Sequence, residues 1–279
     1  MRHVGVDGCK GGWLAVTRNR AGLQHGVFTS ICDLVKAFSE ADQVLIDVPI
    51  GLPWADVPVR PCDRLARGVL GKARRSSVFP VPCREALAAS SLDAARRINK
   101  ASVGRSLSEQ TWAISHKIAE IDRFLLAGRG HRVRIREVHP EVCFWALADR
   151  KPMTYKKSTH EGREERLCVL RRYEPCISAF LSRVLSETLR KHLQADDVLD
   201  ATVAFITSEA TSGKLASLSG DPSHDLAGLP MEMLYLKTWG EAAYLGAAAD
   251  GTAPVTLRTT YYFVPIFDWP PEPRPHYTR

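Results

Sequence analysis

A short apolar run, Val44–Ile46, stops at an aspartate, and it limits the possible folds more than any other feature of the chain. Every residue of the run is apolar, which is typical of a central strand buried on both faces of a sheet. The residues Pro49, Gly51 and Pro53 follow closely and end the strand abruptly. We therefore expect a helix-covered sheet in which Asp47 lies at the carboxyl end of a buried strand.

The N-terminal residues predict an antiparallel start to the same sheet. An alternating segment, Arg2–Val6, leads into a glycine-rich turn, and an apolar run resumes at Trp13–Thr17. This pattern is typical of a hairpin, and Gly26–Thr29 is a candidate third strand. Asp7 closes the first of these strands as Asp47 closes the later one.

Apolar residues at helical spacing, and one more alternating segment, predict the remaining elements. The alternating segment is Arg132–Val138, which we expect to be a half-buried strand. Two late strands are expected at Met231–Leu236 and Thr256–Ile266. Segments with helical spacing cover residues 31–38, 108–126, 142–147, 164–172, 177–193 and 195–210.

Together these elements predict an α/β fold with a mixed sheet, in which an antiparallel three-strand meander continues into parallel strands and helices flank the sheet. A basic helical insertion and extra C-terminal strands are added to this core. The composition, 45% hydrophobic and 25% charged, excludes a disordered, collagenous or coiled-coil chain. We expect residues 1–279 to form one elaborated domain, with the insertion at about 54–105 and the C-terminal extension at about 230–279.

The surplus of positive charge gathers shortly after Asp47. The chain has 38 Lys and Arg against 31 Asp and Glu, a net charge of +7, and residues 60–75 hold much of that surplus. Clustered arginines provide affinity for a phosphate backbone without reading a base sequence, although a solvated surface explains such a cluster equally well. Nucleic acid is therefore the expected partner. The candidate phosphate contacts are Arg60, Arg64, Arg67, Arg74 and Arg75, with Lys156 and Lys157 in a later loop as point charges.

The cysteines and the hydropathy predict a cytoplasmic protein without a membrane partner. The seven cysteines are far apart and include no CxxC pair, so we expect reduced and mostly buried thiols. No charge-free apolar run approaches the roughly 18 residues that a membrane span needs. A homodimer is compatible with the sequence.

Four aspartates predict a metal site. Asp7 and Asp47 each follow an apolar stretch, where burying an unpaired carboxylate costs several kcal/mol. Asp197 and Asp200 lie three residues apart, so they share one face of the predicted helix. The alternatives are Asx turns at the strand ends and an N-terminal cap on the helix. Joined, the four acids form the oxygen-rich site that Mg²⁺ or Mn²⁺ prefers, and two such ions activate water against a phosphodiester.

These residues resemble the RNase H-like nuclease superfamily, and within it the predicted-nuclease family catalogued as domain of unknown function 429. The resemblance covers roughly residues 3–210. The stretches that carry it are Gly5–Trp13, Ile46–Pro53, Arg60–Asp63 with Ala66-Arg67 and Leu70-Gly71, Ser77–Phe79, Glu137–Glu141 and Asp196–Ala201.

The resemblance extends to RuvC-type junction resolvases, which place acids at the same strand ends and in a D-x-x-D-A pair on the last core helix. It implies that Asp7, Asp47, Asp197 and Asp200 are metal ligands for two Mg²⁺ or Mn²⁺ ions. It also implies that Glu137 orients a water or holds a basic side chain near the metals. The alternative for Glu137 is a surface ion pair with an arginine of the same strand. The resolvases carry Glu where this chain has Asp47, so the reach of that ligand differs by a methylene.

The resemblance predicts a divalent-metal-dependent nuclease that hydrolyses phosphodiester bonds, and it leaves open whether the substrate is DNA, RNA, a branched junction or a small nucleotide. Two other functions also remain open. The turn at residues 7–12 resembles the phosphate-binding turn of the actin-like ATPase and sugar kinase superfamily, although no second such turn follows. A catalytically inactive module that binds nucleic acid or protein is the other, and the four retained acids argue against it.

Overall fold

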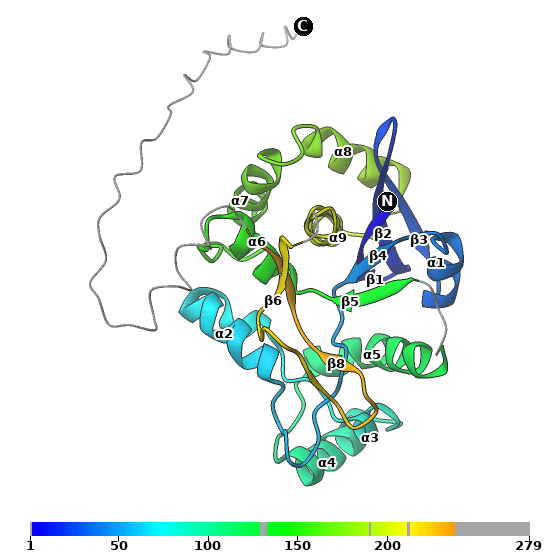
Figure 1. Ribbon diagram of the computed structural model, residues 1–279, viewed down its shortest axis with the longest axis vertical. Helices are drawn as coiled ribbons and strands as arrows, with labels where there is room; N and C mark the ends of the chain where they lie inside the picture. The colour runs from blue at the N-terminus through cyan, green and yellow to red at the C-terminus, as the bar shows by residue number, and fades with distance from the viewer. Residues whose placement is uncertain (1, 129–132, 190, 211–212, 238–279) are drawn as a thin grey trace, which may run out of the picture. The chain divides into compact units, whose positions relative to one another are not determined.

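The computed structural model describes residues 2–128, 133–189, 191–210 and 213–237 (Figure 1). The strand expected at Thr256–Ile266 lies outside these residues. Within the described part of the chain, no helix combines the length and the apolar character that crossing a membrane requires.

A mixed five-stranded sheet with the order β3-β2-β1-β4-β5 forms the centre, as expected. The first three strands pair antiparallel, whereas β4 and β5 continue the sheet parallel to β1. The sequence therefore predicted the fold class correctly. The strands are β1 (His3–Cys9), β2 (Gly12–Asn19), β3 (Gly22–Phe28), β4 (Gln43–Ile46) and β5 (Arg134–Glu137).

Helices cover both faces of this sheet (Figure 1). On one face, residues such as Leu14 and Leu45 pack with Phe144 and Val198 in one apolar cluster. The helices there are α6 (Pro140–Leu147), α7 (His160–Arg171), α8 (Ile177–Glu187) and α9 (Ala195–Ser208). On the other face, α1 (Ile31–Ala37) and α5 (Glu109–Ala127) form a second cluster with the opposite side chains of β1 and β4.

Two predicted helix boundaries are wrong. The helix α7 begins at His160, four residues earlier than expected, because the Thr159 side chain accepts a hydrogen bond from the Gly162 amide at 3.1 Å and caps it. The helix α8 ends at Glu187, where Thr188 adopts an extended backbone, and therefore does not continue to residue 193.

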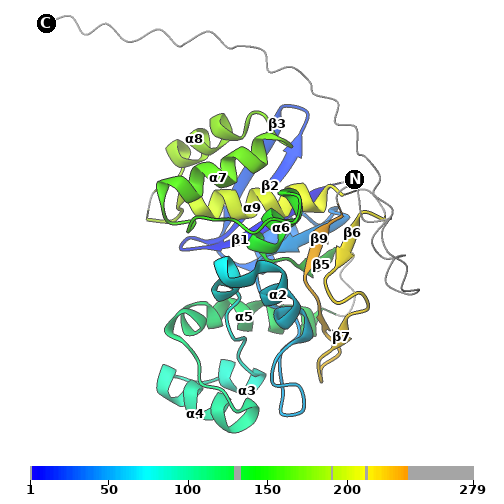
Figure 2. The same cartoon turned by 90° about the vertical axis from the view of Figure 1, so that its left-hand side faces the viewer.

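The insertion after β4 contains real helices (Figure 2). They are α2 (Pro61–Arg74), α3 (Arg84–Leu87) and α4 (Leu92–Val103), with a 3-10 turn, η1, at Arg75–Ser77. The inner face of α2 packs Cys62, Ala66 and Leu70 against α6 and the late strands. The predicted strand at 231–236 is broken in two. The late strands are β6 (Leu215–Ser217), β7 (Ser223–His224), β8 (Pro230–Met231) and β9 (Leu234–Leu236).

Candidate active site

Asp7 and Asp47 lie side by side at one edge of the sheet. Strand β1 pairs in parallel with β4, and the Asp47 amide donates to the Val6 carbonyl at 2.9 Å. Side chains alternate along a strand, so Asp7 and Asp47 point to the face opposite Val6 and Ile46. That face is the one that α9 covers.

A close approach of α9 to β1 brings Asp200 to the same place. A Cβ atom on Gly5 would lie 2.0 Å from the Phe205 amide nitrogen and 2.3 Å from the Ala201 carbonyl oxygen. Only glycine leaves room for this contact between backbones. Ala201 adjoins Asp200, which is 2% exposed, so Gly5 sets the distance from Asp200 to the strand ends.

The acids line a cavity of about 430 Å³. The buried Asp7 carboxylate accepts one hydrogen bond, from the Gly8 amide at 2.8 Å, and Asp200 accepts one from Lys157 Nζ at 2.6 Å. The Asp47 carboxylate makes no hydrogen bond or ion pair with any residue that the structure describes. The cavity thus holds more carboxylate oxygens than the protein itself satisfies.

The pKa values report the same excess of negative charge. Burial raises the pKa of Asp7 well above its usual value, and Asp47 and Asp200 raise it further. Burial, with the charge of Asp200 next, raises the pKa of Asp47 to about 8. The ammonium of Lys157 has a raised pKa, caused mainly by Asp200. Raised pKa values of this kind are typical of neighbouring carboxylates whose negative charge is not balanced by nearby cations.

Asp197 combines a structural role with a place at the cavity. Its carboxylate accepts a hydrogen bond from the Gln194 amide at 2.8 Å, which closes a capping box at the start of α9. The cap that we considered as an alternative is therefore present. Asp197 also lines the acid cavity, and burial raises its pKa to about 6.

The donor set fits a hard divalent cation in chemistry and in burial, because Mg²⁺ and Mn²⁺ prefer carboxylate oxygens and compensate buried negative charge. Across the described ranges, no three His, Cys, Asp or Glu side chains converge closely enough to form a finished ion site. Lys157 reaches into the acids and pairs with Asp200 instead. A cation bound in this cavity would use Asp7, Asp47 and Asp200, and it would compete with Lys157 for Asp200.

Glu137 holds a basic side chain, one of its two expected roles, and the suggested pair with an arginine of its own strand is wrong. Its carboxylate accepts from Arg60 Nη2 at 2.6 Å and Nη1 at 2.8 Å. Arg60 also donates to Asp63 from Nε at 3.0 Å and from Nη2 at 2.6 Å, and to the Ile50 carbonyl at 2.9 Å.

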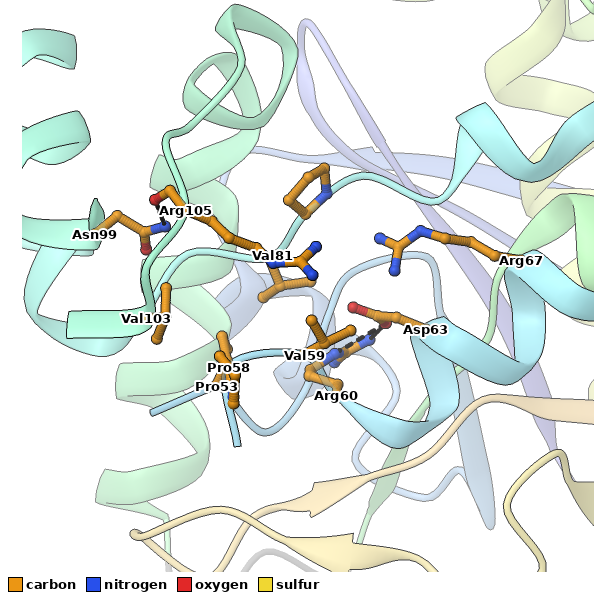
Figure 3. A pocket seen from close by; sticks show the side chains of 11 residues that line it. Pro53, Pro58, Val59, Arg60, Asp63, Arg67, Val81, Asn99, Val103 and Arg105 are labelled. Atoms are coloured by element: carbon orange, nitrogen blue, oxygen red, sulfur yellow. Dashed lines mark hydrogen bonds and ion pairs between the residues drawn. The ribbon is translucent and has the colours of Figure 1, made fainter. Parts of the chain in front are cut away.

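Arg60 is not a phosphate contact, and that prediction is wrong. The side chain is 0% exposed. A guanidinium has five N–H donors, and the bonds to Glu137, Asp63 and Ile50 use all of them. Figure 3 shows the dashed contacts that join Arg60 to Asp63 at the start of α2.

The other predicted cations divide into two groups. Arg67 and Arg74 hold backbone carbonyls: Arg67 donates to Val78 and Phe79, and the buried Arg74 donates to Met153 at 2.9 Å and Thr154 at 2.7 Å. Arg74 also lines the acid cavity with Lys156 and Lys157. The exposed Arg64 and Arg75 do not line this cavity.

Glu141 is a further acid of the cavity that the sequence interpretation left without a role. It is 6% exposed, and its Oε2 atom is buried without a hydrogen-bond partner while Oε1 accepts from the buried Arg166. Burial first, and the charge of Asp200 among other causes, raises the pKa of Glu141. The signal in the sequence was an acid in the otherwise apolar segment that forms α6. The structure buries every residue of this helix.

Lys117 and His139 also line the cavity, and neither was among the predicted site residues. Lys117 Nζ donates to the Gly12 carbonyl at 2.5 Å and lies 4.4 Å from the centre of the Trp13 ring. His139 has Nε2 3.3 Å from the Ser77 carbonyl, while Nδ1 is buried without a partner. Lys117 could not be assigned from the sequence, because nothing local links α5 to the turn after β1.

The glycine-rich turn does not resemble an open phosphate cradle. The Gly11 amide donates to the His192 carbonyl at 2.9 Å, and the Gly8 amide is taken by Asp7. A phosphate-binding turn needs free amides. These two amides therefore stabilise the turn itself and the end of strand β1, and they are not free to bind a phosphate.

The fold and the cavity define this protein as an α/β protein with an acid-lined site at the carboxyl edge of a mixed sheet. The family model described as "Protein of unknown function (DUF429)" matches residues 5–224, so the chain belongs to this family. Searches of curated proteins and of solved structures each gave no match.

Proposed function

We propose that this protein is a divalent-metal-dependent nuclease that hydrolyses phosphodiester bonds of nucleic acid with Mg²⁺ or Mn²⁺. The observation that carries the proposal is the half-buried Asp47 carboxylate, which lines the cavity next to the buried Asp7 and Asp200. It has no hydrogen-bond or ion-pair partner among the residues that the structure describes. An unpaired carboxylate in such a place costs stability, and a bound cation compensates that cost.

Asp7, Asp47 and Asp200 would hold the metal, and Asp197 lines the same cavity. When bound, a pair of such ions lowers the pKa of a water and stabilises the leaving oxygen of the phosphodiester. Lys157 is 46% exposed at its side chain and lies in a loop, so once released from Asp200 it can contact a phosphate as a point charge. Glu137 keeps Arg60 in place behind the strand ends.

The test is Mn²⁺-dependent cleavage by the full chain and by Asp47→Asn, on single-stranded, duplex and branched DNA and on RNA. Because the Asp47 side chain has no hydrogen-bond or ion-pair partner among the described residues, the variant should fold normally. We expect its cleavage rate to fall by more than the roughly 10–100-fold that removal of an outer-shell partner costs. The matched control is Asp56→Asn, since Asp56 is exposed and does not line the cavity.

Calorimetric titration with Mn²⁺ separates the nuclease from an inactive binding module. A nuclease binds Mn²⁺ through Asp47, so the affinity falls in Asp47→Asn and stays in Asp56→Asn. Wild-type protein that binds Mn²⁺ no better than Asp47→Asn and cleaves none of the substrates would refute the proposal.

We also propose that the protein acts in the cytoplasm as a nucleic-acid-binding enzyme. The support is that all seven cysteines are free, which is usual in a reducing compartment.

A further inference from the structure

An exposed aromatic ring stands in the wall of the acid cavity. Phe79 is 37% exposed, and it lines the same cavity as Asp7, Asp47 and Asp200. It belongs to none of the four apolar clusters. A ring that is partly exposed beside a polar site offers a flat apolar contact to a ligand with an aromatic or apolar face.

The backbone that carries Phe79 is held in place before any ligand arrives. Arg67 reaches from α2 and donates to the Val78 carbonyl from Nε at 3.1 Å and from Nη2 at 2.9 Å. The same Nη2 donates to the Phe79 carbonyl at 3.1 Å. Pro80 follows, and its carbonyl accepts from Thr111 of α5 at 3.2 Å. A ring on a fixed backbone loses little conformational entropy when it stacks.

Charge and size restrict the ligand further. Lys156 and Lys157 line the same cavity as Phe79. The exposed Lys156 provides positive charge for a phosphate, as Lys157 does once it leaves Asp200. A volume of about 430 Å³ lies within the range of pockets that take small molecules, so a nucleotide is of suitable size. Paired bases in a duplex expose no free ring face, and extrusion of one costs a few kcal/mol.

Taken with the proposed function, on which this step rests, the geometry points to single-stranded nucleic acid as the substrate, with one unpaired base stacked on Phe79. Stacking on an aromatic side chain tolerates every base, because each base has a π-face. The enzyme should therefore select strandedness and not sequence. Arg67 is a positioning residue that acts through the Phe79 backbone.

The experiment measures binding without cleavage, by fluorescence anisotropy in EDTA, with a short labelled single strand and the matching duplex. Stacking contributes about 1–3 kcal/mol per base, so Phe79→Ala should weaken single-strand binding about 5- to 150-fold. Phe79→Tyr should restore most of the affinity, because it keeps the ring. The control is Leu226→Ala, which also removes an exposed apolar side chain but from a residue outside the cavity, 74% exposed.

Duplex binding should change less than single-strand binding in Phe79→Ala. Single-strand affinity equal to that of the wild type in Phe79→Ala, or a wild-type preference for the duplex, would overturn the inference. Cleavage by the wild type that Asp47→Asn abolishes, together with normal binding by Phe79→Ala, refutes the stacking and keeps the nuclease. A binding loss in Phe79→Ala with no Mn²⁺-dependent cleavage by the wild type supports single-strand binding and refutes the nuclease.

Discussion

The buried ion group of Arg60, Asp63 and Glu137 yields a prediction about stability. Replacement of Arg60 by methionine keeps much of the side-chain volume and removes all five N–H donors. It leaves two carboxylates, 3% and 2% exposed at their side chains, without their cation. The Ile50 amide would still donate to Glu137 at 2.6 Å, so that acid keeps one hydrogen bond.

The expected destabilisation follows from this loss. Breaking a buried ion pair by removal of one partner costs about 3–5 kcal/mol, because the remaining charge is uncompensated. For a domain of about 150–250 residues each kcal/mol shifts Tm by about 2–4 °C. Arg60→Met should therefore lower Tm by about 6–20 °C.

Thermal melting followed by circular dichroism measures the effect, with Arg64→Met as the control. Arg64 lies in the first turn of α2, four residues after Arg60, but is exposed, so its replacement should stay within about 0.5 kcal/mol of the wild type. Removal of the two acids as well, in Arg60→Met/Asp63→Asn/Glu137→Gln, should recover a large part of the lost stability. If Arg60→Met and Arg64→Met have the same Tm, the buried ion pairs of Arg60 do not stabilise the fold. Arg60 would then have to be reconsidered as a surface contact for phosphate.

Three further predictions concern the acid cavity. The folded pKa of Asp47 is raised to about 8 from an ordinary 3.8, so the metal-free protein should lose stability as pH rises between those values. In EDTA, the Tm of Asp47→Asn should therefore fall less steeply with rising pH than the Tm of the wild type. Lys157→Met should have a lower Tm than the wild type without metal, and Mn²⁺ should raise its Tm by more than that of the wild type. The control Lys156→Met removes no ion pair with the acids, so its Tm should match the wild type in both conditions. Gly5→Ala places a Cβ 2.0 Å from a backbone nitrogen of α9, so urea denaturation should show a loss of at least about 1–3 kcal/mol, whereas an unchanged midpoint would contradict the close approach.

The part of the site that could be predicted depends on local pattern and on strand topology. Asp7 and Asp47 each end an apolar run, and the ends of adjacent parallel strands meet at one edge. Asp200 could be added because its spacing from Asp197 fixes one helix face. These inferences need only periodicity and the chain order of the elements.

The part that could not be predicted depends on long-range pairing. Arg60 and Glu137 are 77 residues apart, and no periodicity links them. A run of arginines is usually solvated, so the burial of Arg60 and the carbonyl contacts of Arg67 were not visible in composition. The strands β7 and β8 have two residues each, too short for an alternating pattern to show.

The charge balance of the cavity connects its structure to its proposed chemistry. Elsewhere in the described core, buried acids are matched: Glu137 and Asp63 have Arg60, and Arg84 bonds Asp225 at 2.6 Å. In the cavity, Lys157 from a loop pairs with Asp200, and Asp47 pairs with no cation in the part of the chain that the structure describes. Asp63 and Glu137 share the buried Arg60, whereas no buried arginine neutralises Asp47 and Asp200 in this way among the described residues. An excess of carboxylate in a cavity opposes folding, and this cost is the reason for our proposal that a cation binds at the strand ends once Lys157 leaves Asp200.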